Sequence, residues 1–432
     1  MSSLPMPSHF LLRNNHSLNC ASKFQKFYSR VSSFSFRMIK GQCKVWIFQS
    51  LYALVAIGSV LIFFLAMACA YLYVFPYTST LVYKHGMSNS SDSISECNVF
   101  EGSWIQEDSY PLYNASQCPF AERGFNCISN GRRDRGYMKW RWKPKNCDLL
   151  WFSAREALEG LRGKRVVFVG DSLSRTQWES FICMLMTGLE DKTSVREING
   201  NKITKQIRFL SVEFGTFNLR VDFYRSVFLV QPASSPKHAP KRVKSTIKLD
   251  KLDFISKEWI DADVLVFNSG HWWTPTKLFA TGCYFQVDGA LKLGMPITSA
   301  FKIALETWAS WVDTTINSNR TRVYFRTFES SHWRNHKPCT VTKRPSSLTG
   351  GRDRSSISDA ILGVAKKMKV PVRVLHVTPM GAFRSDGHVG TWSDNPSVPD
   401  CSHWCLPGVP DTWNEILFSY ILSENQVPFN EH

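Results

Sequence analysis

The chain has 432 residues, 44% of them hydrophobic, and a formal net charge of +17 at pH 7. This length and apolar content allow one large domain or two ordinary ones with a packed core. The charge admits nucleic acid or an acidic polymer as a partner, and the topology deduced below excludes nucleic acid.

The first 75 residues predict a membrane anchor. Residues 1–44, the expected basic tail, hold seven Lys or Arg and no Asp or Glu, and residues 45–75 are uncharged and strongly apolar. A helix needs about 20 apolar residues to cross a bilayer. Because the basic flank comes first, the N-terminus is expected in the cytosol and the rest beyond the membrane, a single-pass type II topology. A cleaved signal peptide would be shorter in both parts, and a transit peptide would lack the spanning segment.

The cysteine pattern beyond the anchor is typical of a lumenal protein. Nine cysteines follow it, and in an oxidising compartment most would form disulfides, with one thiol left over. They are Cys97, Cys118, Cys127, Cys147, Cys183, Cys283, Cys339, Cys401 and Cys405. No CxxC pair with a matching second pair occurs, so we predict no metal site. Sequons for N-glycosylation at Asn89, Asn114 and Asn319 also lie beyond the anchor.

Composition divides the rest of the chain into three parts. Residues 76–95 read as a polar stem, and residues 96–150 are rich in cysteine, aromatic and turn-forming residues with little periodicity. Such a segment cannot build its own core, so we expect it to wrap onto the body and be held by disulfides. Residues 151–432 form the expected main domain.

The main domain has an α/β pattern. Short Val- and Phe-rich runs at 165–169, 263–268, 322–328 and 370–377 are typical of buried parallel strands. Helix-like stretches at 174–189, 297–315 and 355–368 lie between or beside them, and 210–231 reads as two strands turning near Gly215. The alternation predicts a parallel sheet with helices on both faces and a ligand site beyond the carboxyl ends of the strands.

A nucleophile is predicted where the first of these strands ends. The sequence Gly170-Asp171-Ser172 follows the strand and precedes a helix, so the serine would be exposed at the positive end of that helix. The same pair of residues also suits a simple helix cap, and the two roles are compatible. Arg175, one helical turn later, would add charge or merely cover the helix.

A base is predicted near the C-terminus. In Asp400-Cys-Ser-His403, residues three apart share a face of a helical turn, so the carboxylate can orient the imidazole as in a hydrolase triad. Cys401 and Cys405 would pin this loop, although a disulfide loop with a structural histidine fits equally well. Asp386 and His388 form a competing pair that spacing alone does not exclude.

Acyl chemistry also needs hydrogen-bond donors for an oxyanion. The candidates are the backbone N–H of Ser172, the side-chain amide of Asn268 at a strand end, and the backbone N–H of Gly215 in a tight turn. Several tryptophans near the motifs suit either sugar stacking or, more commonly, core packing. They are Trp178, Trp272, Trp273, Trp392 and Trp404.

Five blocks together resemble the plant trichome birefringence-like family. They are CNVFEGSW from Cys97, GRRDRGYMKWRWKP from Gly131, GDSLSRTQWES from Gly170, FNSGHWW from Phe267 and DCSHWCLPG from Asp400. The resemblance runs in order from about residue 96 to the C-terminus. It implies a Golgi type II membrane protein with a cysteine-rich N-terminal subdomain and a catalytic domain similar to the GDSL/SGNH esterase fold.

Members of that family O-acetylate wall polysaccharides such as xylan, mannan, xyloglucan or pectin. The resemblance places the nucleophile on Ser172, the base on His403 and the orienting acid on Asp400, with acetyl passing through an acetyl-serine. No bound cofactor is implied; acetyl-CoA or another acetyl carrier would be a co-substrate.

The same resemblance implies disulfide pairings. They are Cys97–Cys147 and Cys118–Cys183, with Cys283, Cys339, Cys401 and Cys405 bridged among themselves and Cys127 left free. Two alternatives to the transferase remain open at this point: an acetyl esterase that uses the same triad with water as acceptor, and a non-catalytic protein that binds wall polymers.

Overall fold

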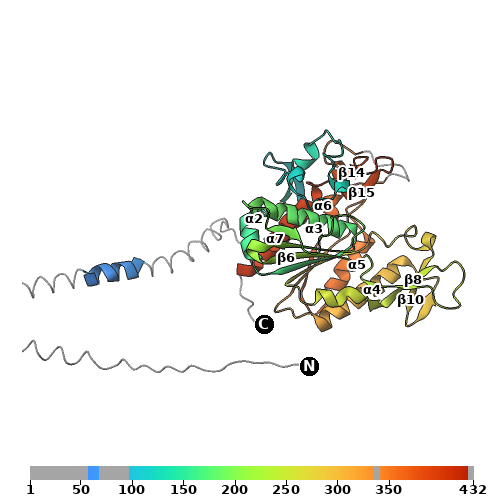
Figure 1. The fold of residues 1–432 in the computed structure, drawn as a ribbon. Helices are drawn as coiled ribbons and strands as arrows, with labels where there is room; N and C mark the ends of the chain where they lie inside the picture. Colours follow the sequence, from blue (N-terminus) through green and yellow to red (C-terminus); the bar gives the residue numbers. More distant parts are fainter. Residues whose placement is uncertain (1–56, 68–96, 334–340, 427–432) are drawn as a thin grey trace, which may run out of the picture. The chain divides into compact units, whose positions relative to one another are not determined.

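The structure is a computed structural model that describes residues 57–67, 97–333 and 341–426 (Figure 1). The chain separates into two compact units, residues 1–94 and 95–432. Residues 57–67 are helical. Among the described residues, no helix is both long and apolar enough to cross a membrane. The predicted tail, the stem, Asn89 and the rest of the predicted anchor lie outside the described residues.

A seven-stranded sheet forms the centre of the second unit, in the order β13-β12-β9-β3-β6-β5-β4. The five strands from β13 to β6 are parallel, and β5 runs antiparallel to both of its neighbours. The strands are β3 (Arg165–Gly170), β4 (Val195–Glu197), β5 (Phe209–Phe214), β6 (Leu219–Arg225), β9 (Val264–Asn268), β12 (Arg322–Arg326) and β13 (Val372–Leu375).

Helices cover both faces of this sheet (Figure 1). On β3, Val166 and Phe168 pack towards α2 (Ala154–Gly160), α3 (Ser172–Leu185) and α7 (Val409–Gln426). The alternate residues Val167 and Val169 pack towards α4 (Ile297–Thr315) and α5 (Ser356–Ala365). Because successive side chains of a strand point to opposite faces, a run of apolar residues buries both. The predicted α/β class, with a mostly parallel sheet, is therefore confirmed.

The remaining elements surround this core. A four-stranded sheet has the order β11-β10-β8-β7, and β1 pairs with β2 and β14 with β15. Their bounds are β1 (Gly102–Gln106), β2 (Trp140–Pro144), β7 (Val230–Ser234), β8 (Ser245–Leu252), β10 (Cys283–Val287), β11 (Ala290–Lys292), β14 (His388–Gly390) and β15 (Asp400–Trp404). Short helical turns are α6 (Thr378–Gly381), η1 (Ala115–Gln117), η2 (Arg123–Phe125), η3 (Gly136–Met138), η4 (Met186–Gly188), η5 (Gly215–Phe217), η6 (Phe254–Trp259), η7 (Phe279–Thr281) and η8 (Ser385–Gly387).

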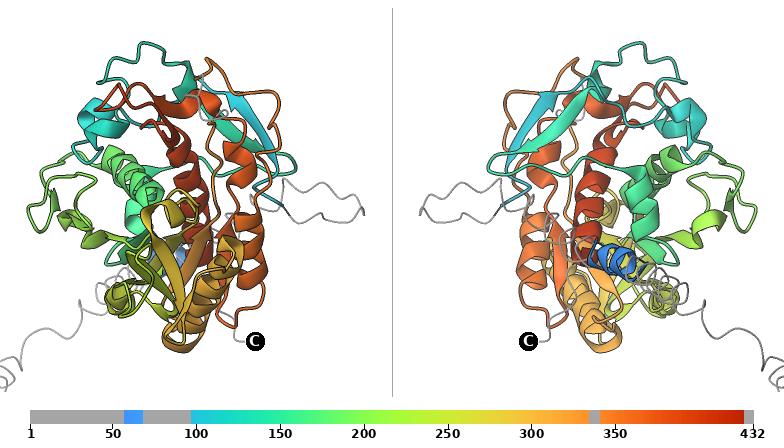
Figure 2. Two further views of the ribbon diagram at one scale, coloured as in Figure 1. Left: turned by 90° about the vertical axis from the view of Figure 1, so that its right-hand side faces the viewer. Right: turned by 90° about the vertical axis from the view of Figure 1, so that its left-hand side faces the viewer.

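The cysteine-rich segment packs onto the body, as its composition predicts. The Trp104 indole N–H donates to the Met380 carbonyl at 2.9 Å, and the Tyr113 hydroxyl donates to Asp411 on α7 at 3.0 Å. Its strands lie at the same end of the unit as β14 and β15 (Figure 2). The segment is therefore part of the structure around the base-bearing strand β15.

Three disulfides join described cysteines. Cys97–Cys147 and Cys118–Cys183 are confirmed. The expectation that Cys127 is free is wrong: it bonds to Cys405, and the free described cysteine is Cys283, which is buried. The cysteine-rich segment docks directly against the end of β15, so Cys405 bonds to Cys127 of that segment and not to Cys283, Cys339 or Cys401. Cys401 is also disulfide-bonded, and Cys339 lies outside the described residues.

Removing the Cys127–Cys405 bond is expected to lower the free energy of unfolding by about 2–5 kcal/mol, because it spans 278 residues and restrains the unfolded chain strongly. The variant is Cys127→Ala with Cys405→Ala, and urea unfolding measures the change. Cys283→Ala, which removes a buried but unbonded thiol, is the control and should lose less. Equal losses in the two proteins would contradict the assignment of the bond.

Stability is expected to fall as pH rises from 6 to 8.5. Burial raises the pKa of Glu179 to about 8 and that of both Asp411 and Glu415 to about 7. In the unfolded chain these groups titrate near 4, so the folded state holds protons that unfolding releases. Their contribution is complete below about pH 4 and is lost as pH rises through 7 and 8.

The expected drop in Tm over that interval is about 5 °C, measured by calorimetry. Glu415→Gln, which keeps the shape of a protonated carboxyl, should reduce the drop. The carboxyls whose pKa is depressed, Asp171 and Asp400, act only at lower pH and leave this interval unaffected. A Tm that stays level or rises from pH 6 to 8.5 would refute the prediction.

Candidate active site

The nucleophile lies at the turn from β3 into α3. Ser172 is the first residue of α3, so its backbone N–H has no partner within the helix. Asp171 is the N-cap, and its Oδ1 accepts a hydrogen bond from the Leu173 N–H at 2.9 Å. The predicted cap and the predicted nucleophile thus occur together on adjacent residues, and Ser172 is partly exposed.

The predicted base and acid meet this serine. His403 Nε2 lies 2.7 Å from Ser172 Oγ, and His403 Nδ1 lies 2.6 Å from Asp400 Oδ2. The other carboxylate oxygen accepts the backbone N–H groups of Ser402 and His403, each at 2.9 Å. Burial alone would raise the pKa of Asp400, but the contact with His403 and these two N–H groups hold it well below its usual range. The carboxylate is therefore ionised and fixed in orientation.

The local backbone differs from the expected helical turn. Residues 400–404 form strand β15, which pairs with β14, and the Asp400 side chain folds back over Ser402 to reach the ring. A further hydrogen bond fixes the backbone of His403, because the His388 Nδ1–H donates to the His403 carbonyl at 2.9 Å.

The competing pair Asp386 and His388 does not face Ser172. Asp386 is buried in an ion pair with Arg384 at 2.8 Å. The His388 ring stacks on Trp404 with centroids 3.9 Å apart, and its Nε2 lies 2.7 Å from His332 Nδ1. Burial lowers the pKa of His388 to about 3. This pair supports the base strand and has no access to the nucleophile.

A pocket of about 240 Å³ opens over the three side chains. The cysteine-rich segment forms one of its walls with Glu122, Gly124 and Phe125, and the Phe125 ring stacks on His403 with centroids 5.4 Å apart. The segment has no periodicity that would have placed Phe125 here from sequence. The Cys127–Cys405 bond lies two residues from both Phe125 and His403, so it fixes this wall against the base.

Arg175 lies in the same pocket but is neutralised within the protein. It is buried, forms an ion pair with Glu122, and lies 3.7 Å from Glu179. Its guanidinium also lies 5.3 Å from the Phe125 ring centre. Its ion pair with Glu122 attaches the cysteine-rich segment to α3, a role that the sequence did not predict.

Asn268 holds the nucleophile turn from the end of β9. Its Oδ1 accepts the Asp171 N–H at 3.2 Å and its Nδ2 donates to Asp171 Oδ1 at 3.0 Å. A Cβ on Gly170 would lie 1.9 Å from Asn268 Oδ1, so this approach requires glycine. Asn268 is buried and committed to Asp171, and its role as an oxyanion donor stays a prediction.

The assignment of Gly215 to the oxyanion hole is wrong. The hairpin predicted near Gly215 is present, but β5 runs antiparallel to β6, so its end at Phe214 pairs with Leu219. That places η5 at the end of the sheet where β3 begins, opposite to Ser172. The Gly215 N–H donates to the Ser194 carbonyl at 3.1 Å.

The predicted tryptophans and glycosylation sites differ in exposure. Trp178, Trp273 and Trp404 are buried in the core, whereas Trp272 and Trp392 are partly exposed. Asn114 and Asn319 are exposed, as glycosylation requires. Among the described residues, no group of three or more His, Cys, Asp or Glu is placed to hold a metal ion.

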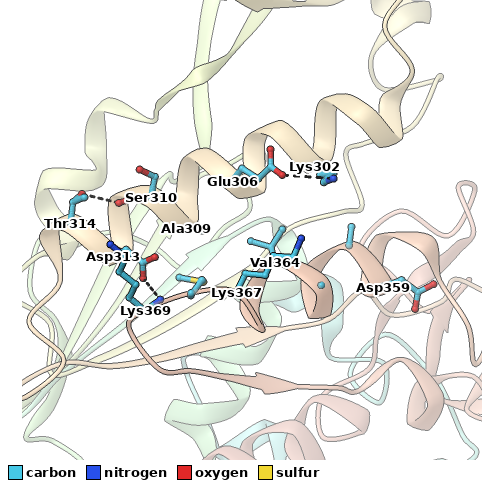
Figure 3. A pocket seen from close by; sticks show the side chains of 13 residues that line it. Lys302, Glu306, Ala309, Ser310, Asp313, Thr314, Asp359, Val364, Lys367 and Lys369 are labelled. Atoms are coloured by element: carbon cyan, nitrogen blue, oxygen red, sulfur yellow. Dashed lines mark hydrogen bonds and ion pairs between the residues drawn. The ribbon is translucent and has the colours of Figure 1, made fainter.

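A second pocket, of about 570 Å³, lies between α4 and α5 (Figure 3). Lys302 and Glu306 extend from α4 along it, and Asp313 accepts the Lys369 N–H at 3.0 Å across its end. These helices cover the face of the sheet opposite α3. No histidine lines this pocket, so it offers no nucleophile–base pair like that at Ser172.

The fold and the site define a GDSL/SGNH-like acyl-esterase domain, a class of acyl-transfer enzymes. Residues 149–420 match the family described as "GDSL/SGNH-like Acyl-Esterase family found in Pmr5 and Cas1p", and residues 95–148 match the "PMR5 N terminal Domain". The chain belongs to the trichome birefringence-like family, as the sequence blocks indicate.

Three relatives from Arabidopsis thaliana illustrate the similarity. The chain is 59% identical over 375 residues to "Protein trichome berefringence-like 7", covering 86% of the chain and 84% of the relative. It is 41% identical over 358 residues to "Protein trichome birefringence-like 9", covering 78% and 87%. It is 37% identical over 358 residues to "Protein trichome birefringence", covering 78% and 58%.

Proposed function

We propose that the protein is an O-acetyltransferase that moves acetyl groups to hydroxyls of a plant cell-wall polysaccharide through an acetyl-serine. The observation that carries this proposal is the hydrogen-bonded series Ser172 Oγ–His403–Asp400, which opens into a pocket. Nucleophile, base and orienting carboxylate in this order are the parts that acyl transfer requires.

In the first half-reaction, Ser172 Oγ attacks the acetyl carbonyl of the donor, acetyl-CoA or another acetyl carrier, while His403 Nε2 takes the hydroxyl proton. The tetrahedral intermediate collapses, the donor's leaving group departs with that proton, and Ser172 is acetylated. Asp400 stabilises the imidazolium that forms between these steps. We expect the Ser172 N–H, at the start of α3, to donate to the oxyanion.

In the second half-reaction, a sugar hydroxyl attacks the acetyl-serine and gives its proton to His403 Nε2. Collapse returns the proton to Ser172 Oγ and releases the acetylated polymer. Water attacking the same intermediate would release acetate, so the transferase must favour the sugar over water in the pocket.

We place this reaction in the Golgi lumen, with the protein anchored as a single-pass type II membrane protein. The basic tail before an apolar run supports this topology, and the disulfides of the second unit suit an oxidising compartment.

The test supplies the full-length protein in detergent with an acetyl donor and deacetylated xylan, mannan, xyloglucan or pectin. Acetyl bound to at least one polymer, measured separately from free acetate, is the expected result. If only free acetate forms with every polymer, the protein is an acetyl esterase and not a transferase. Neither product, from folded protein, would favour a protein that only binds polymers.

A further inference from the structure

The charges around the pocket are matched, with one exception. Arg175 pairs with Glu122, and Lys205 at the rim lies 3.5 Å from Asp394. Asp400 is held by His403 and two backbone N–H groups. The exception is Arg225, which lines the pocket but lies within 4 Å of no carboxylate among the described residues.

Arg225 is positioned beside the nucleophile by the sheet. It ends β6, and its Cα pairs with that of Gly170, two residues before Ser172. Val221 and Phe223 of the same strand pack on the α3 side, so Arg225, at the next alternate position, extends from that side towards the pocket. Ser226, the residue after Arg225, donates its N–H to the Gly170 carbonyl at 2.9 Å. This bond fixes the register of β6 against β3.

The guanidinium presents a free edge. Its Nη1 donates to the Lys205 carbonyl at 3.1 Å, and among the described residues no acceptor is recorded for Nε or Nη2. These two N–H groups form the fork that binds a carboxylate or phosphate through two parallel hydrogen bonds. The guanidinium also lies 5.6 Å from the ring centre of the partly exposed Trp272, which limits its freedom.

The surroundings favour an anion at this edge. Arg225 is half-buried, and burial, together with the positive charges of Arg175 and Arg208, lowers its pKa, while the negative charge of Asp171 opposes this shift only in part. Arg175 is already paired with Glu122, so among the described residues Arg225 is the cation of this wall that has no adjacent carboxylate. Leaving a partly desolvated cation unpaired is unfavourable. An anion bound at this edge would lie in the pocket that contains Ser172, because Arg225 and Ser172 both line it.

We propose that Arg225 forms an anion-binding subsite of this pocket, which takes a negatively charged group of a substrate. This inference rests on the proposed function for the identity of that substrate. Two sources share the chemistry: the carboxylate of a uronic acid in the acceptor polymer, and a phosphate of the acetyl donor.

Calorimetric binding to the full-length protein in detergent tests the subsite without turnover. The probes are trigalacturonate for the uronate, inorganic pyrophosphate for the phosphate and neutral xylotriose as reference, all at one ionic strength. Arg225→Gln removes the charge and the fork, and Arg225→Lys restores only the charge. Arg196→Gln is the matched control, because it removes an exposed arginine paired with Glu213 on β4 and β5, at the opposite end of the sheet.

The expected result is that the wild type binds at least one charged probe and that Arg225→Gln weakens this binding tenfold or more. Arg225→Lys should be intermediate and Arg196→Gln within twofold of wild type. Selective loss of trigalacturonate assigns the subsite to the acceptor, and selective loss of pyrophosphate to the donor.

Three results would overturn the proposal, and the first two are no binding of either charged probe to the wild type and affinities of Arg225→Gln within twofold of wild type. An equal loss of xylotriose binding would indicate a damaged pocket and would also overturn it. Retention of the wild-type Tm confirms that the variants fold. Because binding needs no acetyl transfer, a protein that binds the probes but never acetylates Ser172 would refute the proposed function and leave the subsite standing.

Discussion

Ser172→Ala is expected to reduce acetyl transfer to polymer by about 10⁴-fold or more, because it removes the hydroxyl that lies 2.7 Å from His403 Nε2 in the pocket. Among the described residues, the Ser172 hydroxyl forms no other hydrogen bond, so the Tm should stay within about 2 °C of wild type. Initial rates of polymer-bound acetyl, measured with saturating donor, give the comparison.

Ser174→Ala is the matched control for this variant. Ser174 lies on the same helix, is buried, and does not line the pocket. It should retain activity within about threefold of wild type, since it contacts neither substrate nor base. If Ser172→Ala kept more than a tenth of the wild-type rate, Ser172 would not be the nucleophile.

Asp400→Asn is expected to lower kcat by about 10³–10⁴-fold with a much smaller change in KM. In the native site the Asp400 carboxylate acts only as an acceptor, of the His403 Nδ1–H and of two backbone N–H groups. An amide keeps one acceptor for the backbone and turns its NH₂ towards Nδ1. The ring proton then moves to Nε2, where it prevents His403 from accepting the Ser172 proton.

The kcat and KM of Asp400→Asn, measured with the polymer that the wild type acetylates, separate this role from substrate binding. If kcat were unchanged and KM rose by about 10³–10⁴-fold instead, Asp400 would bind substrate and would not orient the base. A kcat within tenfold of wild type would show that His403 needs no orienting carboxylate, contrary to the geometry observed.

The sequence anticipates those parts of the fold that local patterns control. The buried strands β3 and β9 read as apolar runs followed by polar turns, and this pattern placed Gly170-Asp171-Ser172 and Asn268 at one edge of the sheet. Asp400 and His403 are close in sequence, so their contact needed little tertiary information. The pairing of both with Ser172, more than two hundred residues away, came from chemical complementarity and from the family resemblance.

Long-range contacts account for the errors. A tight turn at Gly215 predicts a free N–H for the site, but the antiparallel direction of β5 carries this glycine to the far end of the sheet. The family resemblance implies a free Cys127, and composition predicts that its segment wraps onto the body but does not show that Cys127 meets Cys405 at the end of β15. Phe125 and Arg225 were missed because one lies in an irregular segment and the other ends a strand whose neighbour, β3, is known only from the assembled sheet.

The most direct test of the proposed mechanism is the mass of the intact protein after brief exposure to excess acetyl donor without acceptor. We expect the wild type to gain one acetyl group, located by peptide mapping on Ser172, and Ser172→Ala to gain none there. Adding deacetylated polymer should remove this group from the protein and transfer it to the polymer. Folded wild-type protein that transfers acetyl to the polymer yet never carries acetyl on Ser172 would contradict the account.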